Sequence, residues 1–121
     1  MKKTAFTIVL VIITLVALML GRANAGDISL YGEDLYDSEG YNYGVNYYAD
    51  NNTGSDLYAV VYITSQENVN GDCVYGMILL APYESHVLVG SFATADYDYG
   101  WSVNISANYG SSPEQVDAPP Y

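Results

Sequence analysis

The chain has 121 residues, of which 14 are acidic and three are basic, so its formal net charge is −11 at neutral pH. All three basic residues lie in residues 1–25, and residues 26–121 therefore carry a formal charge close to −14. Nucleic acid and anionic lipid headgroups bind through cationic side chains, so this composition excludes both as partners and leaves cations, basic proteins and neutral glycans.

Residues 1–25 have the layout of a bacterial secretory signal peptide. A short cationic start precedes an apolar run from Ala5 to Leu20, and the Ala-Asn-Ala sequence that ends at Ala25 fits a cleavage site. The alternative is an uncleaved anchor, since the run is only slightly short for a membrane span of about 20 residues. The small-residue ending favours cleavage, which predicts a periplasmic or extracellular protein without membrane contact after processing.

Residues 26–40 form an acidic segment in which apolar residues are sparse, and we expect at most a weak edge strand near Ile28–Tyr31. The next stretch alternates in character, which predicts a strand with one buried face. The face expected to be buried carries Tyr41, Tyr43, Val45, Tyr47 and Ala49, and the opposite face carries Asn42, Gly44 and Asn46. Residues 50–55, "DNNTGS", are turn formers.

Residues 56–65, "DLYAVVYITS", are apolar on both faces and rich in β-branched and aromatic residues, which predicts a central strand covered on two sides. Residues 66–72 read as a loop with a turn at Asn70-Gly71. A second apolar strand is expected over residues 73–81, and a turn at Pro82 leads to a returning strand over residues 86–92.

Residues 96–109, "DYDYGWSVNISANY", alternate without exception, which predicts one long strand with a bend or bulge at Gly100. The odd positions, which would face the core, hold Tyr97, Tyr99, Trp101, Val103, Ile105, Ala107 and Tyr109. The even positions would face water.

Several short strands separated by turn signals, with no helical spacing of apolar residues, predict an all-β fold: a single immunoglobulin-like antiparallel β-sandwich. We expect its core over residues 41–110 and a proline-rich, extended tail over residues 111–121. Cys73 is the only cysteine, and its place at a strand start favours a buried thiol over pairing between chains.

The stretch "NYYADNNTGSDLYAVVYITSQENVNG" joins a strand ending in Ala-Asp-Asn, a short turn, a long strand and a Glu-Asn-Val segment. With "APYES", the aromatic strand up to Tyr109 and the closing "DAPPY", it resembles the small immunoglobulin-like β-sandwich that precedes the catalytic domain of bacterial lysostaphin-like zinc metallopeptidases. The resemblance covers roughly residues 43–121. It implies a fold and an envelope setting but no catalytic residue, because the peptidase domain is not present and His86 is the only histidine.

One candidate site is a calcium loop at Asp50, Asn52 and Asp56, which place oxygen ligands at alternating positions. The alternative is an ordinary hairpin turn, since Gly54 stands where a third side-chain ligand is expected. Calcium is therefore the one cofactor that the sequence raises.

Two further pairs are candidates for binding. Tyr58 and Tyr62 share a strand face and could form part of an aromatic platform for a glycan, although tyrosine also fills half-buried strand positions well. Asp96 and Asp98 would share the face of a strand, where acids that point to water are the default. His86 reads as a residue at the edge of a loop.

These features predict an exported, non-catalytic β-sandwich module that binds a protein or a cell-envelope component, with a basic partner favoured by the charge. Pairing of a free sheet edge with a partner strand is one mode of binding. The runner-up is a structural subunit of a surface fibre or matrix, and a calcium- or glycan-binding module is the remaining alternative. No constellation of residues predicts an enzyme.

Overall fold

The computed structural model describes residues 26–120, so the predicted signal peptide and its cleavage site lie outside the described residues. Within this range the chain forms seven β-strands and a short 3-10 helix, η2. Their bounds are β1 Ile28–Tyr36, β2 Asn42–Asn51, β3 Leu57–Glu67, β4 Val69–Cys73, β5 Met77–Leu80, β6 Val87–Thr94, β7 Ser102–Gly110 and η2 Pro113–Gln115.

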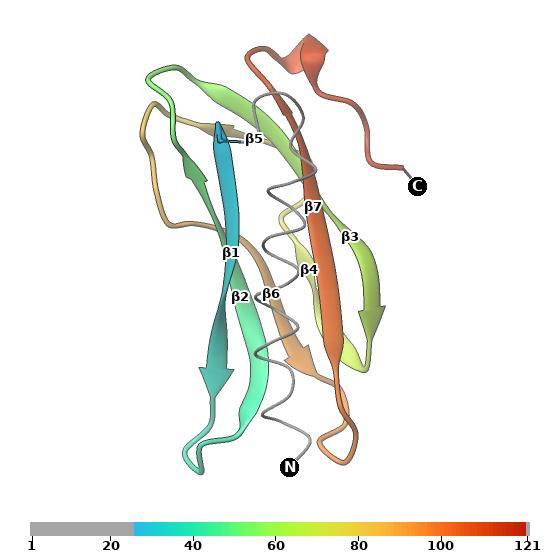
Figure 1. The fold of residues 1–121 in the computed structure, drawn as a ribbon. Coiled ribbons are helices and arrows are strands. Elements are labelled where there is room, and N and C mark those ends of the chain that lie inside the picture. Colours follow the sequence, from blue (N-terminus) through green and yellow to red (C-terminus); the bar gives the residue numbers. More distant parts are fainter. Residues whose placement is uncertain (1–25, 121) are drawn as a thin grey trace.

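The strands form two antiparallel sheets, which we call sheet A and sheet B (Figure 1). Sheet A has the strand order β1-β2-β6-β4, and sheet B has the order β5-β3-β7. Buried side chains of both sheets form one apolar core between them. The prediction of an all-β sandwich is therefore confirmed.

The buried side chains Tyr47 and Trp101 connect the two halves of the sandwich across this core. Tyr47 of β2 is fully buried, and its hydroxyl donates a hydrogen bond to the backbone oxygen of Val103 in β7 at 3.1 Å. Its ring meets the edge of Phe92 with centroids 6.0 Å apart. Trp101 is also buried, and its indole N–H donates to the backbone oxygen of Asn42 at 3.3 Å. Large rings are buried here with their polar atoms satisfied, which is the condition for tyrosine and tryptophan in a core.

The first two strands differ from the sequence expectation. β1 is longer than the expected weak edge strand and pairs with β2 along its whole length, at the edge of sheet A. A bulge at Tyr43 shifts the phase of β2, so that Asn42 and Gly44 are buried and Tyr43 is only half-buried. The predicted inward face of Tyr41 and Tyr43 was therefore wrong, because periodicity cannot locate an extra residue in a strand.

The loop expected at residues 66–72 was also wrong. β3 runs on to Glu67, and after Asn68 alone the chain continues as β4, which belongs to sheet A rather than sheet B. Asn68 has a φ of +55°, a conformation that asparagine adopts more readily than most residues, and the chain reverses there rather than at Asn70-Gly71. The strand expected over residues 73–81 is accordingly split, with β4 ending at Cys73 and β5 beginning at Met77.

The long alternating strand was half right. β7 begins at Ser102, and within it Val103 and Ile105 are buried as predicted. Residues 95–101 form a loop instead, in which Tyr97 is 47% exposed and Tyr99 is 68% exposed. These two tyrosines were wrongly expected to face the core.

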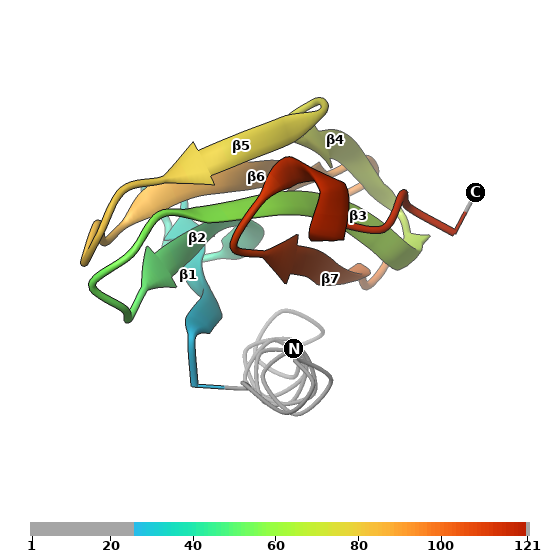
Figure 2. The ribbon, with the colours of Figure 1, turned by 90° about the horizontal axis from the view of Figure 1, so that it is seen from above.

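The C-terminal residues fold back instead of extending away. After η2, the amide of Asn108 on β7 donates hydrogen bonds to the backbone oxygens of Asp117 and Ala118 at 3.1 and 3.2 Å. Figure 2 shows this segment running beside β3 and β7. It therefore lies along sheet B.

Candidate functional site

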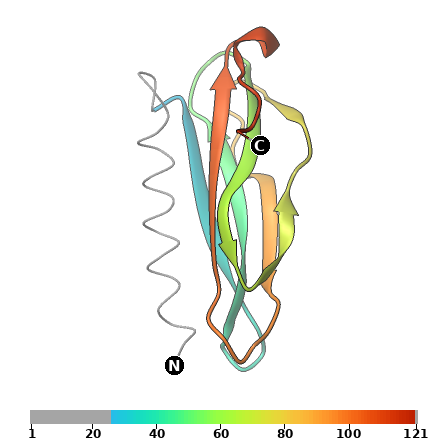
Figure 3. The same cartoon turned by 90° about the vertical axis from the view of Figure 1, so that its right-hand side faces the viewer.

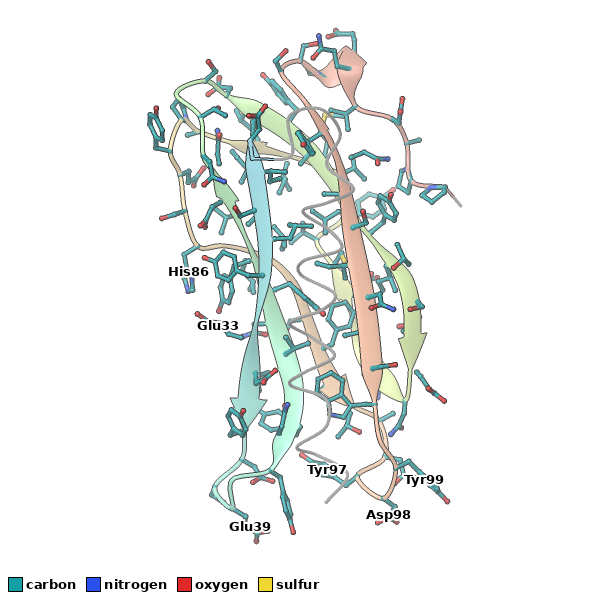
Figure 4. All side chains as sticks on the ribbon, in the orientation of Figure 1. Glu33, Glu39, His86, Tyr97, Asp98 and Tyr99 are labelled. Carbon is teal, nitrogen blue, oxygen red and sulfur yellow. The ribbon has the colours of Figure 1, made fainter. Side chains whose placement is uncertain are left out.

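The connection from β1 to β2 and the connection from β6 to β7 lie at the same end of the molecule, as Figures 1 and 3 both show. We call these two connections, residues 37–41 and 95–101, the loop end. Figure 4 shows Glu39 on the first connection, and Tyr97, Asp98 and Tyr99 on the second, all projecting at this end. The loop end therefore presents tyrosine rings and carboxylates together.

The side chain of Asn68 holds the second connection in place. Its amide nitrogen lies 2.9 Å from the backbone oxygen of Asp96, 3.1 Å from that of Tyr99 and 3.0 Å from that of Gly100. Its amide oxygen accepts the backbone N–H of Asp96 at 3.0 Å. One side chain from the junction of β3 and β4 thus satisfies backbone groups at both ends of this loop, and the buried ring of Trp101 anchors the end of the loop in the core.

The first connection is held by Asp37 in a similar way. Its carboxylate accepts the backbone N–H groups of Glu39 at 2.9 Å and of Tyr41 at 3.0 Å. Gly40, with a φ of +85°, donates its N–H to the backbone oxygen of Asp37. Both connections are therefore pre-organised, and the loop end resembles a recognition surface in composition, since tyrosine, serine, glycine and asparagine are typical of binding loops.

The predicted pair Asp96 and Asp98 lies in this loop and not on a strand face. The carboxylate of Asp96 accepts the backbone N–H of Asp98 at 2.9 Å, so Asp96 contributes to the shape of the loop. Asp98 is exposed beside the two tyrosines. Of the predicted pair, Asp98 is thus the one whose side chain is labelled at the projecting end of the molecule (Figure 4).

Two of the three predicted calcium ligands, Asp50 and Asn52, are engaged in hydrogen bonds of the chain. The carboxylate of Asp50 accepts the hydroxyl of Tyr31 at 3.0 Å and the backbone N–H of His86 at 2.8 Å. The amide of Asn52 donates to the backbone oxygen of Gly26 at 2.9 Å and to Ser29 Oγ at 2.8 Å. Asp56 is exposed before β3. Across residues 26–120, no group of three or more His, Cys, Asp or Glu side chains is arranged to hold a metal ion.

The turn that contains these residues is organised by Asn51, which the sequence interpretation did not single out. Asn51 is 2% exposed, and its amide nitrogen lies 2.7 Å from the backbone oxygen of Ser55, 3.0 Å from that of Leu80 and 2.9 Å from that of Ala81. A buried amide with several backbone partners has a structural role. The only sequence signal that could have pointed to Asn51 and Asn68 is their position next to a long apolar strand.

Tyr58 and Tyr62 share the outer face of β3, as predicted, and both are half-buried. The hydroxyl of Tyr62 donates to the amide oxygen of Asn108 at 3.4 Å, beside the folded-back C-terminal segment. These two rings therefore do not form a fully exposed platform for a glycan.

Cys73 is half-buried and packs against the core. Burial, with a smaller contribution from Asp72, raises the pKa of its thiol to about 12, so the thiol stays protonated at neutral pH. Cys73 also lines a cavity of about 430 Å³ together with Val60, Tyr75 and Pro119. A protonated thiol is a poor nucleophile, so the cavity offers no thiolate chemistry.

Comparisons of the chain with models of protein families, with curated proteins and with solved structures found no match. The structure also shows, for residues 26–120, no helix with the length and apolar character needed to cross a membrane.

Proposed function

We propose that the chain is an exported, non-catalytic β-sandwich module that binds a basic protein or a basic cell-envelope component through its loop end. The observation that carries this proposal is the loop end itself, where exposed tyrosines and carboxylates are displayed on two hydrogen-bonded connections. Exposed rings supply contact area at a low cost in side-chain entropy, and pre-organised loops lower the cost of binding.

The charge supports a basic partner. Residues 26–121 hold 14 acidic side chains and no Lys or Arg. This negative charge would attract the cationic surface of a partner from many directions of approach. The sequence layout of residues 1–25 supports export to the periplasm or beyond. The resemblance to the sandwich that accompanies lysostaphin-like peptidases supports an accessory role in the cell envelope.

The test is a comparison of variants in capture from envelope extract. The double variant Tyr97→Ser/Tyr99→Ser removes both rings of the loop end, and Tyr83→Ser removes a ring that is 72% exposed and lies by the β2–β3 turn. We expect wild type and Tyr83→Ser to retain the same component, and the double variant to lose at least about tenfold in affinity for it. Equal retention by all three proteins would refute the loop end as the binding surface.

A second candidate, a subunit of a surface fibre or matrix, is favoured by the edge strand β5. This strand is the uncharged sequence Met77–Leu80, and Met77 and Leu79 are 43% and 52% exposed. Apolar edge strands pair readily with other strands. Light scattering that rises with protein concentration in wild type and not in Leu79→Lys would support this candidate. A monomer at high concentration would reject it.

A further inference from the structure

Sheet A carries a second cluster of aromatic and acidic side chains, which lies away from the loop end in space (Figure 4). We call Tyr31, Glu33, Tyr48, Asp50 and His86 the His86 cluster. Tyr31 and Tyr48 face each other across β1 and β2, with ring centroids 5.9 Å apart. The imidazole of His86 stacks on the ring of Tyr48, with centroids 3.8 Å apart and planes 10° apart.

The backbone of His86 is held in an uncommon conformation that aims the imidazole at this cluster. Its φ is +59°, in the left-handed region that non-glycine residues seldom adopt. The backbone N–H of His86 donates to the carboxylate of Asp50 at 2.8 Å, which fixes this conformation. Strained residues of this kind persist where the surroundings hold them, and they concentrate at sites that bind.

The hydrogen bonds also determine where the protons lie. Partial burial and the neighbouring Asp50 carboxylate raise the pKa of Tyr31 to about 12, so its hydroxyl is protonated at neutral pH. That single proton is donated to Asp50 at 3.0 Å, so the contact of 3.2 Å between the hydroxyl and Nδ1 of His86 requires Nδ1–H to be the donor. In the neutral imidazole, Nε2 is then an acceptor.

The cluster leaves ring surface and acceptors open to solvent. The His86 side chain is 53% exposed although Tyr48 covers one of its faces, so its other face is accessible. The Glu33 carboxylate is 54% exposed and lies 4.0 Å from His86 Nδ1. Figure 4 shows Glu33 and His86 projecting side by side from the same edge of the molecule.

We propose that the His86 cluster binds the guanidinium group of an arginine side chain from a basic protein partner. A guanidinium is planar, stacks on aromatic faces, has five donors and no acceptor, and pairs with carboxylates. The cluster offers the matching features: an open ring face, the Glu33 carboxylate and the Nε2 acceptor. The absence of Lys and Arg from residues 26–121 means that no cationic side chain of this segment competes for the site.

The site is tested on the purified protein with the probe acetyl-Gly-Arg-Gly-amide, followed by the ¹⁵N and ¹H NMR signals of the His86 ring. We expect saturable shifts of these signals. The same peptide with citrulline, which has the shape of arginine without its charge, should bind at least about fivefold more weakly.

Three variants separate a specific site from general attraction by negative charge. Glu33→Gln should weaken arginine binding roughly two- to fivefold, whereas Glu114→Gln in η2, an exposed position outside both the loop end and the His86 cluster, removes the same charge and should leave it unchanged. His86→Gly keeps the positive φ without strain, because glycine tolerates it, and should remove the stacking contribution of about two- to fivefold, followed through the Tyr31 and Tyr48 ring signals.

The proposal is overturned if the citrulline peptide binds as well as the arginine peptide. It is also overturned if Glu114→Gln weakens binding as much as Glu33→Gln, or if the His86 ring signals do not respond to the probe. Because the loop end takes no part in these measurements, the result is independent of the function proposed above.

Discussion

The loop end and the His86 cluster are both acidic and aromatic, but they are built in different ways. In the His86 cluster, Tyr31 and Tyr48 are placed by the strand register of sheet A, and their side chains contact one another. At the loop end, residues 95–101 belong to no strand and are held by the amide of Asn68. The comparison shows that exposed tyrosine and acidic side chains can be held in position in two ways: by the pairing of strands, or by a polar side chain that binds the backbone of a loop.

Each region also lies next to an asparagine that satisfies several backbone carbonyls. Asn51, beside Asp50 of the His86 cluster, is buried, and its amide contacts the backbone oxygens of Ser55, Leu80 and Ala81. Asn68 makes the equivalent contacts at the loop end and is half-buried. The difference in burial predicts a difference in what each side chain contributes to stability.

The largest expected effect comes from removing these two amides. Asn51→Ala leaves the buried backbone oxygen of Leu80 and two part-buried backbone oxygens unsatisfied, and should lower the free energy of unfolding by about 3 kcal/mol. Asn68→Ala should lower it by about 2 kcal/mol, because water can reach part of the loop that it holds. Urea denaturation measures both values. Asn70→Ala, at an exposed position on β4, serves as the control.

Asn68→Gly sharpens this experiment, because glycine keeps the φ of +55° and removes only the amide. It should expose the amides of residues 95–101 to faster hydrogen exchange and leave the Tyr31 and Tyr48 signals unchanged. A larger loss in Asn68→Ala than in Asn51→Ala would contradict the assigned roles.

A smaller effect is expected at alkaline pH, and the part of it that arises in the His86 cluster comes from Tyr31. The pKa of Tyr31 is raised from 10.0 to about 12 in the folded protein. Between these pH values the unfolded chain has released this proton and the folded chain has kept it, so stability falls as pH rises. Tyr31→Phe should therefore show a shallower loss of stability over this interval.

The ionisation itself is read from the absorbance of tyrosinate. The difference between the titrations of wild type and Tyr31→Phe isolates the one phenol, and its midpoint should lie near pH 12. A midpoint near pH 10 would show that the Asp50 contact is absent in solution.

The smallest effect concerns calcium. Exposed carboxylates at both regions repel one another, so NaCl should raise the melting temperature by screening. A site at Asp50, Asn52 and Asp56 would add a specific increment with CaCl₂. We expect equal shifts at matched ionic strength, because Asp50 and Asn52 already have hydrogen-bond partners. If CaCl₂ raised the melting temperature more than NaCl did, and Asp56→Asn abolished this difference, the result would support a calcium site in this loop.

Much of the architecture follows from local pattern. The two-faced apolar run was predicted as a central strand, and β3 lies between β5 and β7. The alternation at Val103 and Ile105 was predicted correctly, because one face of β7 meets the core. Such patterns indicate which face of a strand is buried, and that information is enough to predict a β-sandwich.

The errors arise where a contact distant in sequence decides the local structure. Residues 96–100 alternate like a strand, but Asn68, 28 residues earlier, binds their backbone and bends it into a loop. The His86 cluster likewise joins Tyr31 to a histidine 55 residues away. Periodicity contains no information about such pairs, so it can predict the fold but not which of these side chains come together.

The protonated thiol of Cys73 has a practical consequence. Thiol reagents attack the thiolate, which is scarce while β4 stays paired with β6 and the sulfur stays half-buried. Labelling of this single sulfur should then proceed only in molecules whose β4 has locally detached. The rate of labelling would therefore report how often β4 detaches from β6 at the edge of sheet A.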